Sequence, residues 1–196
     1  PVLTAGANSG LGLELVKQSA AKGWPVIATH RRDGVPETLQ PVAAEHPNVR
    51  VERMDVASIA EVRALAAKLA GTPIDVLINN AGIYSDRSAC ADEACRGEDA
   101  TQSFGNLDYE LFDTIMAVNV RGPLLVSEAF AANVRASRQK KIVSISSTNG
   151  SVTFTLGGPG AIAYRAGKAA RNREMRRGAA RGAAGGGDSG GWWRPG

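Results

Sequence analysis

Tyr164 and Lys168 stand four residues apart in the segment Tyr-Arg-Ala-Gly-Lys, a spacing that places both side chains on one face of a helix. An ammonium group held beside a phenol favours the phenolate and lowers the pKa of a tyrosine. Such a tyrosine can act as a general acid or base nearer neutral pH, while a serine hydroxyl nearby orients a carbonyl group. The pair alone is a weak signal, because chance often supplies this spacing.

A glycine-rich loop near the start of the chain has the composition of a nucleotide-binding turn. It follows a strand predicted over Val2–Ala5 and opens a helix predicted from about Gly10 to Lys22. Glycines allow a tight turn and close backbone approach to a pyrophosphate, and the helix N-terminus supplies N–H donors. A purely structural turn is the alternative. The residues predicted to bind a cofactor here are Gly6, Asn8, Ser9, Gly10, Leu11 and Gly12.

The end of the second predicted strand, Trp24–Thr29, indicates which dinucleotide a loop of this kind would bind. The strand runs into His30-Arg31-Arg32 and has no acidic residue at its tip. A carboxylate there would bind the ribose hydroxyls of NAD, whereas an arginine suits the 2′-phosphate of NADP. We therefore predict NADP (NADPH), with NAD less favoured. Arg31 is the first choice for the phosphate contact and Arg32 the second, against the alternative of plain surface arginines.

Apolar strands alternate with amphipathic helices along the chain, which predicts a parallel sheet covered on both faces. Further strands are expected at Val49–Met54, Ile74–Ile78 and Lys141–Ser146, with helices around Ile59–Ala70 and over Tyr109–Phe130, the latter interrupted near Gly122-Pro123. Short crossovers and right-handed connections favour one topology. The predicted fold class is α/β, a Rossmann-like doubly wound parallel sheet.

Three segments in this order resemble the short-chain dehydrogenase/reductase (SDR) family, and the resemblance runs from Val2 to about Ala170. They are Gly-Ala-Asn-Ser-Gly-Leu-Gly-Leu-Glu-Leu-Val at 6–16, Asn-Asn-Ala-Gly-Ile at 79–83 and Ala-Tyr-Arg-Ala-Gly-Lys at 163–168. Within the family the likeness is greatest to the C-factor (C-signal) proteins and related carbonyl reductases. One departure is Ala5, where the family commonly has a threonine whose side chain bonds within the loop.

The resemblance implies a role for each of four residues in hydride transfer from NADPH to a carbonyl carbon, or in the reverse alcohol oxidation. Tyr164 would donate the proton, and Lys168 would lower the pKa of that tyrosine and bind the nicotinamide ribose. Ser147 would hold the carbonyl oxygen; it matches the family better than Ser146, because Gly150 follows it three residues later. Asn119 would place a relay water.

The resemblance also extends the cofactor site beyond the glycine loop. Asp55 and Val56 resemble the pair that contacts adenine in the family, although Asp55 would also be unremarkable as a helix N-cap. The turn after the fourth strand lies where parallel sheets bind ligands, outside the carboxyl ends of their strands. The cofactor contacts implied outside the glycine loop and Arg31 are Asp55, Val56, Asn80, Ala81, Gly82, Tyr164 and Lys168.

Two segments lie outside this pattern and set the predicted domain limits. Residues 1–170 would form one NAD(P)-binding Rossmann-like domain, with residues 85–103 as an acidic, solvated loop insertion. Residues 171–196 are rich in Gly, Arg and Ala, which predicts the start of a helix and then disorder. Family members continue here with two more strands, which we expect to be lacking. A frameshift, a diverged end and a basic regulatory tail are the alternatives.

The charge distribution argues against nucleic acid as a partner. The net charge is +4, but residues 1–170 contain 17 Lys/Arg and 17 Asp/Glu, so the tail supplies the excess. A neutral body offers no electrostatic footprint for DNA. No apolar stretch approaches the roughly 18 residues of a membrane helix. We expect no signal peptide and no metal site. Two cysteines suit a reducing compartment, so we expect a cytoplasmic protein.

Three hypotheses about function follow. The first is an NADP(H)-dependent oxidoreductase that reduces a small-molecule carbonyl compound or oxidises an alcohol. The second is a catalytically impaired SDR chain that keeps the signature residues. The third is a nucleotide-binding signalling protein of the C-factor kind. The resemblance also implies a homodimer or homotetramer, paired through the helices that start near Tyr109 and Tyr164.

Overall fold

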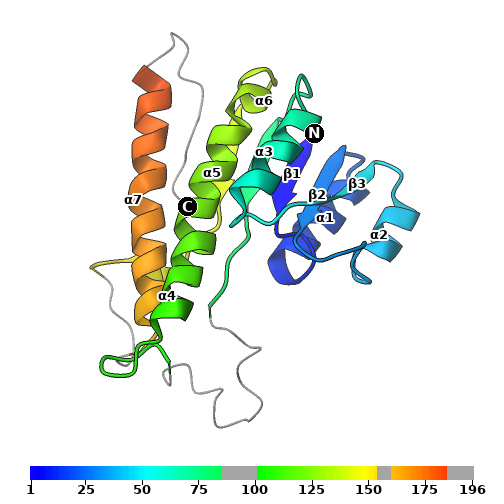
Figure 1. Ribbon diagram of the computed structural model, residues 1–196. Helices are drawn as coiled ribbons and strands as arrows, with labels where there is room; N and C mark the ends of the chain where they lie inside the picture. The colour runs from blue at the N-terminus through cyan, green and yellow to red at the C-terminus, as the bar shows by residue number, and fades with distance from the viewer. Residues whose placement is uncertain (85–100, 154–159, 185–196) are drawn as a thin grey trace.

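A computed structural model describes residues 1–84, 101–153 and 160–184, with the side chains of the last helix described up to Arg176 (Figure 1). The centre of the molecule is a sheet of five parallel strands in the order β3-β2-β1-β4-β5. The strands are β1 (Val2–Ala5), β2 (Val26–His30), β3 (Val49–Arg53), β4 (Val76–Asn79) and β5 (Lys141–Ser144). The predicted α/β fold with a doubly wound parallel sheet is confirmed.

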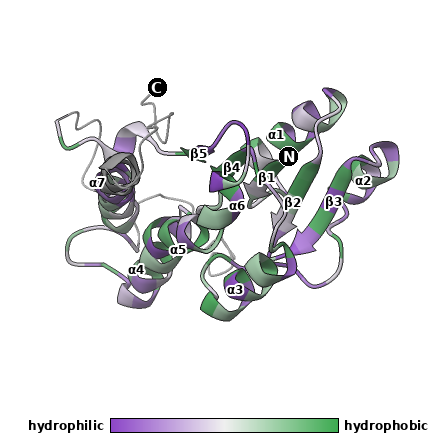
Figure 2. Cartoon of the chain, turned by 90° about the horizontal axis from the view of Figure 1, so that it is seen from above, coloured by the Kyte–Doolittle hydropathy of each residue, from purple (hydrophilic) through white to green (hydrophobic). Residues whose placement is uncertain are grey.

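Helices cover both faces of this sheet (Figure 2). On one face lie α1 (Gly10–Ala21) and α2 (Gln40–Glu45); on the other lie α3 (Ile59–Lys68), α5 (Gly122–Ala129) and α6 (Ala131–Arg135). Alternate side chains of β2 enter different cores, as the pleat requires. Val26 packs with Val16 of α1 in one core, and Ile27 packs with Val62 of α3 in the other. Because both faces are covered, a ligand of this sheet would contact it at the strand ends.

The helix predicted over Tyr109–Phe130 consists of three consecutive segments. These are α4 (Tyr109–Met116), the π-helical turn η2 (Ala117–Arg121) and α5. The expected interruption thus lies just before Gly122-Pro123, where Pro123 has no N–H to donate to the preceding turn. Single π turns inside helices are frequent at functional sites. This one contains Asn119.

The last helix, α7 (Ile162–Ala184), extends farther than the sequence predicts. It continues through Gly178 and Gly182, within the segment 171–196 where we expected only the start of a helix, and the predicted domain limit after Ala170 falls inside it. Its first half packs against α4, η2 and α5. Although α7 has 23 residues, no described helix is both long and apolar enough to cross a membrane. Residues 185–196, and the disorder expected there, lie outside the described residues.

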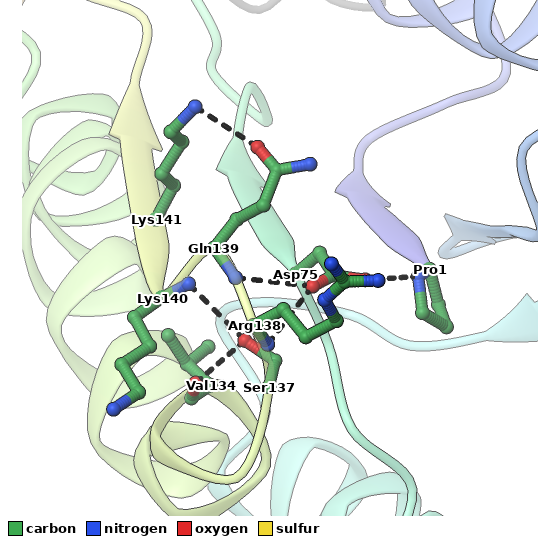
Figure 3. A network of polar contacts seen from close by, with 8 residues as sticks. All are labelled: Pro1, Asp75, Val134, Ser137, Arg138, Gln139, Lys140 and Lys141. Carbon is green, nitrogen blue, oxygen red and sulfur yellow. Dashed lines mark hydrogen bonds and ion pairs between the residues drawn. The ribbon is translucent and has the colours of Figure 1, made fainter.

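A polar network at the amino end of the sheet positions β5 beside β4 (Figure 3). One carboxylate oxygen of Asp75 accepts hydrogen bonds from the backbone N–H groups of Arg138 and Gln139, each at 3.1 Å. The other oxygen pairs with the amino group of Pro1 at 2.8 Å. Ser137 donates to the carbonyl oxygen of Val134 at 2.8 Å and closes the turn from α6. These contacts fix where β5 begins, and therefore where its carboxyl end meets that of β4.

Candidate cofactor and active site

The glycine-rich loop is tightly packed against the turn that follows β4. Gly6 has a φ of +78°, and a Cβ atom there would lie 2.7 Å from the Cα of Ala81. The side chain of Asn80 donates to the carbonyl oxygen of Gly6 at 2.8 Å. A Cβ atom on Gly12 would overlap both that carbonyl oxygen and the Asn80 side chain. Glycine is therefore required at positions 6 and 12 to bring the N-terminus of α1 against the sheet.

A cavity of about 440 Å³ lies over this loop, at the carboxyl ends of β1, β2 and β4. Most of the predicted cofactor residues line it: Gly6, Asn8, Ser9, Leu11, Arg31, Asp55, Val56, Asn80, Ala81 and Gly82. Residues with no predicted role line it as well: His30, Met54, Ile83 and Val118, together with Arg32, our second choice for the phosphate contact. Gly10, Gly12, Tyr164 and Lys168 do not line this cavity.

The far end of the cavity, at β2, is basic. Arg31 and Arg32 are exposed at the tip of the strand, whereas His30 is only 4% exposed. Burial lowers the pKa of His30, and the charges of Arg53 and Arg32 lower it further against a backbone contact with Arg32 that raises it. Asp55 uses one carboxylate oxygen to accept from the N–H of Ala57 at 2.9 Å, which holds the loop after β3 in place.

Asn119 connects the π turn to the loop after β4. It is fully buried, its side-chain amide donates to the carbonyl oxygen of Ile83 at 2.8 Å, and its side-chain oxygen accepts from the N–H of Ile83 at 2.9 Å. A Cβ atom on Gly82 would lie 3.3 Å from that oxygen and 3.8 Å from the Nζ of Lys168. Gly82 also lines the cavity. The cavity wall, Asn119 and Lys168 therefore meet at Gly82.

Tyr164 and Lys168 share one face of the first turns of α7, as their spacing predicts. The Nζ atom of Lys168 lies 5.4 Å from the centroid of the Tyr164 ring and donates to the carbonyl oxygen of Ile145 at 3.1 Å. Burial lowers the pKa of Lys168 to about 8, with a smaller contribution from the charge of Arg171. The ring of Tyr84 packs on that of Tyr164, with centroids 4.6 Å apart.

The two adjacent serines after β5 have different surroundings. Ser147 precedes the short 3-10 turn η3 (Thr148–Gly150), and its hydroxyl accepts from the N–H of Asn149 at 3.2 Å. Ser146 instead donates to the side-chain oxygen of Asn172 on α7 at 2.5 Å. A Cβ atom on Gly150 would lie 2.9 Å from the backbone oxygen of Lys168. Gly150 therefore lets η3, with Ser147 at its start, pack closely on α7.

Sequence reasoning missed Gln102, which fixes the two tyrosines. Its side-chain amide donates to the carbonyl oxygen of Tyr84 at 2.7 Å, and its side-chain oxygen accepts from the N–H of Tyr164 at 3.1 Å. Gln102 is 1% exposed, although we expected residues 85–103 to form a solvated loop. That expectation is wrong for Gln102, because its amide satisfies two buried backbone groups. Residues 85–100 lie outside the described residues.

Arg171 is the second residue that sequence reasoning missed. We placed Arg171 in the tail, but it is a residue of α7 and only 1% exposed. Its side chain extends from α7 to the carboxyl ends of β4 and β5. It donates to the hydroxyl of Ser144 at 2.7 Å and to the carbonyl oxygen of Asn79. Burial lowers its pKa to about 10, so it keeps its charge at neutral pH. The only signal in the sequence is its position, three residues after Lys168 and thus on the same face.

The described residues contain no cluster of three or more histidine, cysteine or acidic side chains that could hold a metal ion. The site joins two features: a nucleotide-sized cavity with a basic end, and beside it a half-buried Tyr164 with the buried Lys168. The first suits an anionic dinucleotide. The second suits proton transfer to a carbonyl oxygen.

Comparisons with known proteins agree with this geometry. Residues 1–184 match the family described as short chain dehydrogenase. This match continues past Ala170, where we expected the resemblance to end. A structure of an SDR protein from Burkholderia multivorans with bound NADP superposes with a TM-score of 0.79 and 32% identity, over 93% of this chain and 73% of that one. The NADPH-bound carbonyl reductase from chicken fatty liver gives a TM-score of 0.78 and 30% identity, over 97% and 75%.

Curated relatives include C-signal from Myxococcus xanthus, which is 33% identical over 115 residues, 59% of this chain and 60% of that protein. The chain spans about half the length of several other curated relatives that it matches, at 53–55% of each. The family match nevertheless covers all of the described residues, from β1 to the end of α7. The chain therefore belongs to the short-chain dehydrogenase/reductase family.

Proposed function

We propose that the protein is an NADPH-dependent reductase of a small carbonyl compound, which also catalyses the reverse oxidation of the alcohol. The observation that carries this proposal is the meeting point at Gly82. There the cavity wall lies beside the Nζ of Lys168 and the side-chain oxygen of Asn119. A nucleotide bound along the cavity would thus extend toward the Tyr164–Lys168 pair, which is where a carbonyl group needs a proton donor.

The residues present fit NADPH rather than NADH. The backbone of the glycine loop and the N-terminus of α1 would receive the pyrophosphate. Arg31 and Arg32 would pair with the 2′-phosphate, and the tip of β2 has no carboxylate to bind a free 2′-hydroxyl. The neighbouring structures with bound NADP and NADPH support this assignment. When bound, NADPH would supply the hydride for the carbonyl carbon.

Within this proposal, the chain's own residues donate the proton and stabilise the phenolate that its loss leaves. The hydroxyl of Tyr164 donates a proton to the carbonyl oxygen while the hydroxyl of Ser147 donates a hydrogen bond to it. The buried ammonium of Lys168, 5.4 Å from the ring centroid, stabilises the phenolate that remains. The side-chain oxygen of Asn119 keeps a second lone pair beside Lys168, which suits a water that returns the proton.

A second candidate is a nucleotide-binding signalling protein in which turnover is secondary. The similarity to C-signal favours it, because that relative is matched over more than half of its length. Both candidates are consistent with a cytosolic protein. For either one we also propose a homodimer or homotetramer that pairs through α4 and α7, because Tyr109 at the start of α4 is 72% exposed.

Replacement of Tyr164 by phenylalanine tests the proposed chemistry. The variant loses only the hydroxyl, so the fold and the affinity for NADPH should persist while turnover falls by about 100-fold or more. Oxidation of NADPH by a panel of aldehydes and ketones is followed by its absorbance, with Lys17→Met as the control on an exposed residue of α1. Equal activity in wild type and Tyr164→Phe contradicts the proposal, and NADPH binding without turnover in the wild type favours the signalling candidate.

A further inference from the structure

Arg171 is a buried cation beside the proposed site, and neither the cofactor contacts nor the proposed chemistry uses it. Among the described residues its guanidinium pairs with no carboxylate, and its Nη1 atom has no hydrogen-bond partner. A buried charge without a counter-ion is costly, and an apolar side chain of similar volume is often tolerated as well or better. Support of the fold therefore does not account for a guanidinium here, and perturbed charged groups of this kind cluster at functional sites.

The hydrogen bonds of Arg171 reach the peptide group to which Lys168 is bound. Arg171 donates to the carbonyl oxygen of Asn79, and the N–H of Ile145 donates to that same oxygen at 3.0 Å. Arg171 also donates at 2.7 Å to the hydroxyl of Ser144, the residue before Ile145. The carbonyl oxygen of Ile145 in turn accepts from the Nζ of Lys168 at 3.1 Å. The guanidinium thus fixes the two strand ends that present the acceptor of Lys168.

The charge of Arg171 acts on both members of the Tyr164–Lys168 pair. Arg171 lies three residues after Lys168, so both side chains leave α7 on one face. Burial, followed by repulsion from Arg171, lowers the pKa of Lys168 to about 8. Negative charge on Tyr164 raises the pKa of Arg171 against the larger effect of burial. Because this attraction is mutual, the guanidinium stabilises the phenolate that remains after Tyr164 has lost its proton.

The other charged groups around Lys168 lie nearer the solvent. Lys168 faces Tyr164, Asn119 of η2 and the Ile145 carbonyl group, of which Tyr164 alone titrates. On α7 itself, Arg165 is half-buried and three residues before Lys168. The charged side chains on the other helices that pack against α7 are all exposed: Glu110, Asp113, Arg121 and Glu128. Of all these charges, that of Arg171 is the one that lowers the pKa of Lys168.

We propose that Arg171 is a positioning residue of the reductase site, which holds the acceptor of Lys168 in place and stabilises the phenolate of Tyr164 after proton donation. This inference rests on the proposed function, because it requires Tyr164 to give its proton to a carbonyl oxygen. Arg171 does not line the cofactor cavity. Its contribution should therefore appear in the proton-transfer step and not in the affinity for NADPH.

Two variants separate the hydrogen bonds of Arg171 from its charge. Arg171→Met removes both, whereas Arg171→Gln removes the charge and keeps an amide donor for the strand ends. Arg173→Met, on an exposed arginine of the same helix, is the control for the loss of one positive charge. Turnover of a carbonyl compound that the wild type reduces is measured from pH 6 to pH 10 with saturating NADPH, and fluorescence titration gives the Kd of NADPH.

On the acidic plateau, kcat should fall about tenfold in Arg171→Met and less in Arg171→Gln, while the Kd of NADPH stays within about twofold. In the wild type, turnover should fall as pH rises through the pKa of Lys168, because the neutral amine no longer stabilises the phenolate. Removal of the Arg171 charge raises that pKa. The falling limb should therefore move to higher pH by about half a unit or more in both variants.

The position of the falling limb decides between a role in the reaction and a role in the fold. A limb that stays in place in both variants overturns the inference even if kcat falls, and a shift of equal size in Arg173→Met overturns it as well. Should Arg171→Met not fold, Arg171→Gln gives the same comparison. Wild-type turnover with an unmoved limb leaves the proposed function intact. NADPH binding by the wild type without turnover of any carbonyl compound overturns the proposed function instead.

Discussion

Replacement of Lys168 by methionine should abolish turnover and yet leave the protein at least as stable at neutral pH. Lys168 is 5% exposed, and within the described part of the chain its ammonium donates to the carbonyl oxygen of Ile145. Burial, followed by the charge of Arg171, lowers its pKa from 10.5 to about 8. That difference corresponds to a cost of about 3 kcal/mol for keeping the charged lysine in the folded state.

The sign of the pH dependence follows from the lowered pKa. Between pH 8 and 10.5 the folded protein binds fewer protons at Lys168 than the unfolded chain, so the free energy of unfolding rises with pH across this window. Below pH 8 the full cost is present. Methionine removes this cost, but it leaves the Ile145 carbonyl without its donor, which costs about 1–3 kcal/mol. The net change at pH 7 is therefore a stabilisation of about 0–2 kcal/mol.

Urea unfolding at pH 7, 8, 9 and 10 measures this effect, with Lys17→Met as the control on an exposed lysine of α1. Groups that titrate in both proteins cancel in the difference between wild type and Lys168→Met. We expect the difference to favour the variant at pH 7 and to shrink or reverse as pH rises to 10. Parallel stability curves for the two proteins would refute the claim that Lys168 is held in a buried, unfavourable position for function.

Four further variants test individual contacts. Gly12→Ala should destabilise the protein by about 1–3 kcal/mol and weaken NADPH, because its Cβ overlaps the loop, whereas Gly10→Ala, with open space around it, should cost about 1 kcal/mol in urea unfolding. Gln102→Ala should cost about 2 kcal/mol, and it should lower kcat at saturating NADPH because Tyr164 loses its backbone anchor. Arg31→Ala should weaken NADPH by about 1–3 kcal/mol in fluorescence titrations and leave NADH nearly unchanged; equal losses would contradict the phosphate assignment.

The sheet and the nucleotide loop could be predicted from sequence because their signals are local. Apolar strands, glycine spacing and the i, i+4 placement of Tyr164 and Lys168 depend on neighbours in the chain. The cavity then followed from the topology, since parallel strands present their carboxyl ends on one edge. These features account for most of the residues that line the cavity.

The features that sequence reasoning missed depend on contacts between distant segments. Gln102 stands in a polar stretch, and its burial depends on two backbone groups more than 15 positions away. Arg171 stands in a basic stretch, and its burial follows from the strand ends that it bonds. The composition of a segment averages such residues with their neighbours. A single buried polar side chain therefore cannot be recognised from composition. The predicted domain limit after Ala170 lies within α7.

The most direct test of the central claim is a titration of the intact chain with NADPH and with NADH, followed by cofactor fluorescence and then by addition of carbonyl compounds. We predict saturable NADPH binding that is tighter than NADH binding, with turnover of at least one aldehyde or ketone that Tyr164→Phe loses. Absence of NADPH binding by the folded wild-type chain would contradict the claim that this cavity and this Tyr–Lys pair form a reductase site.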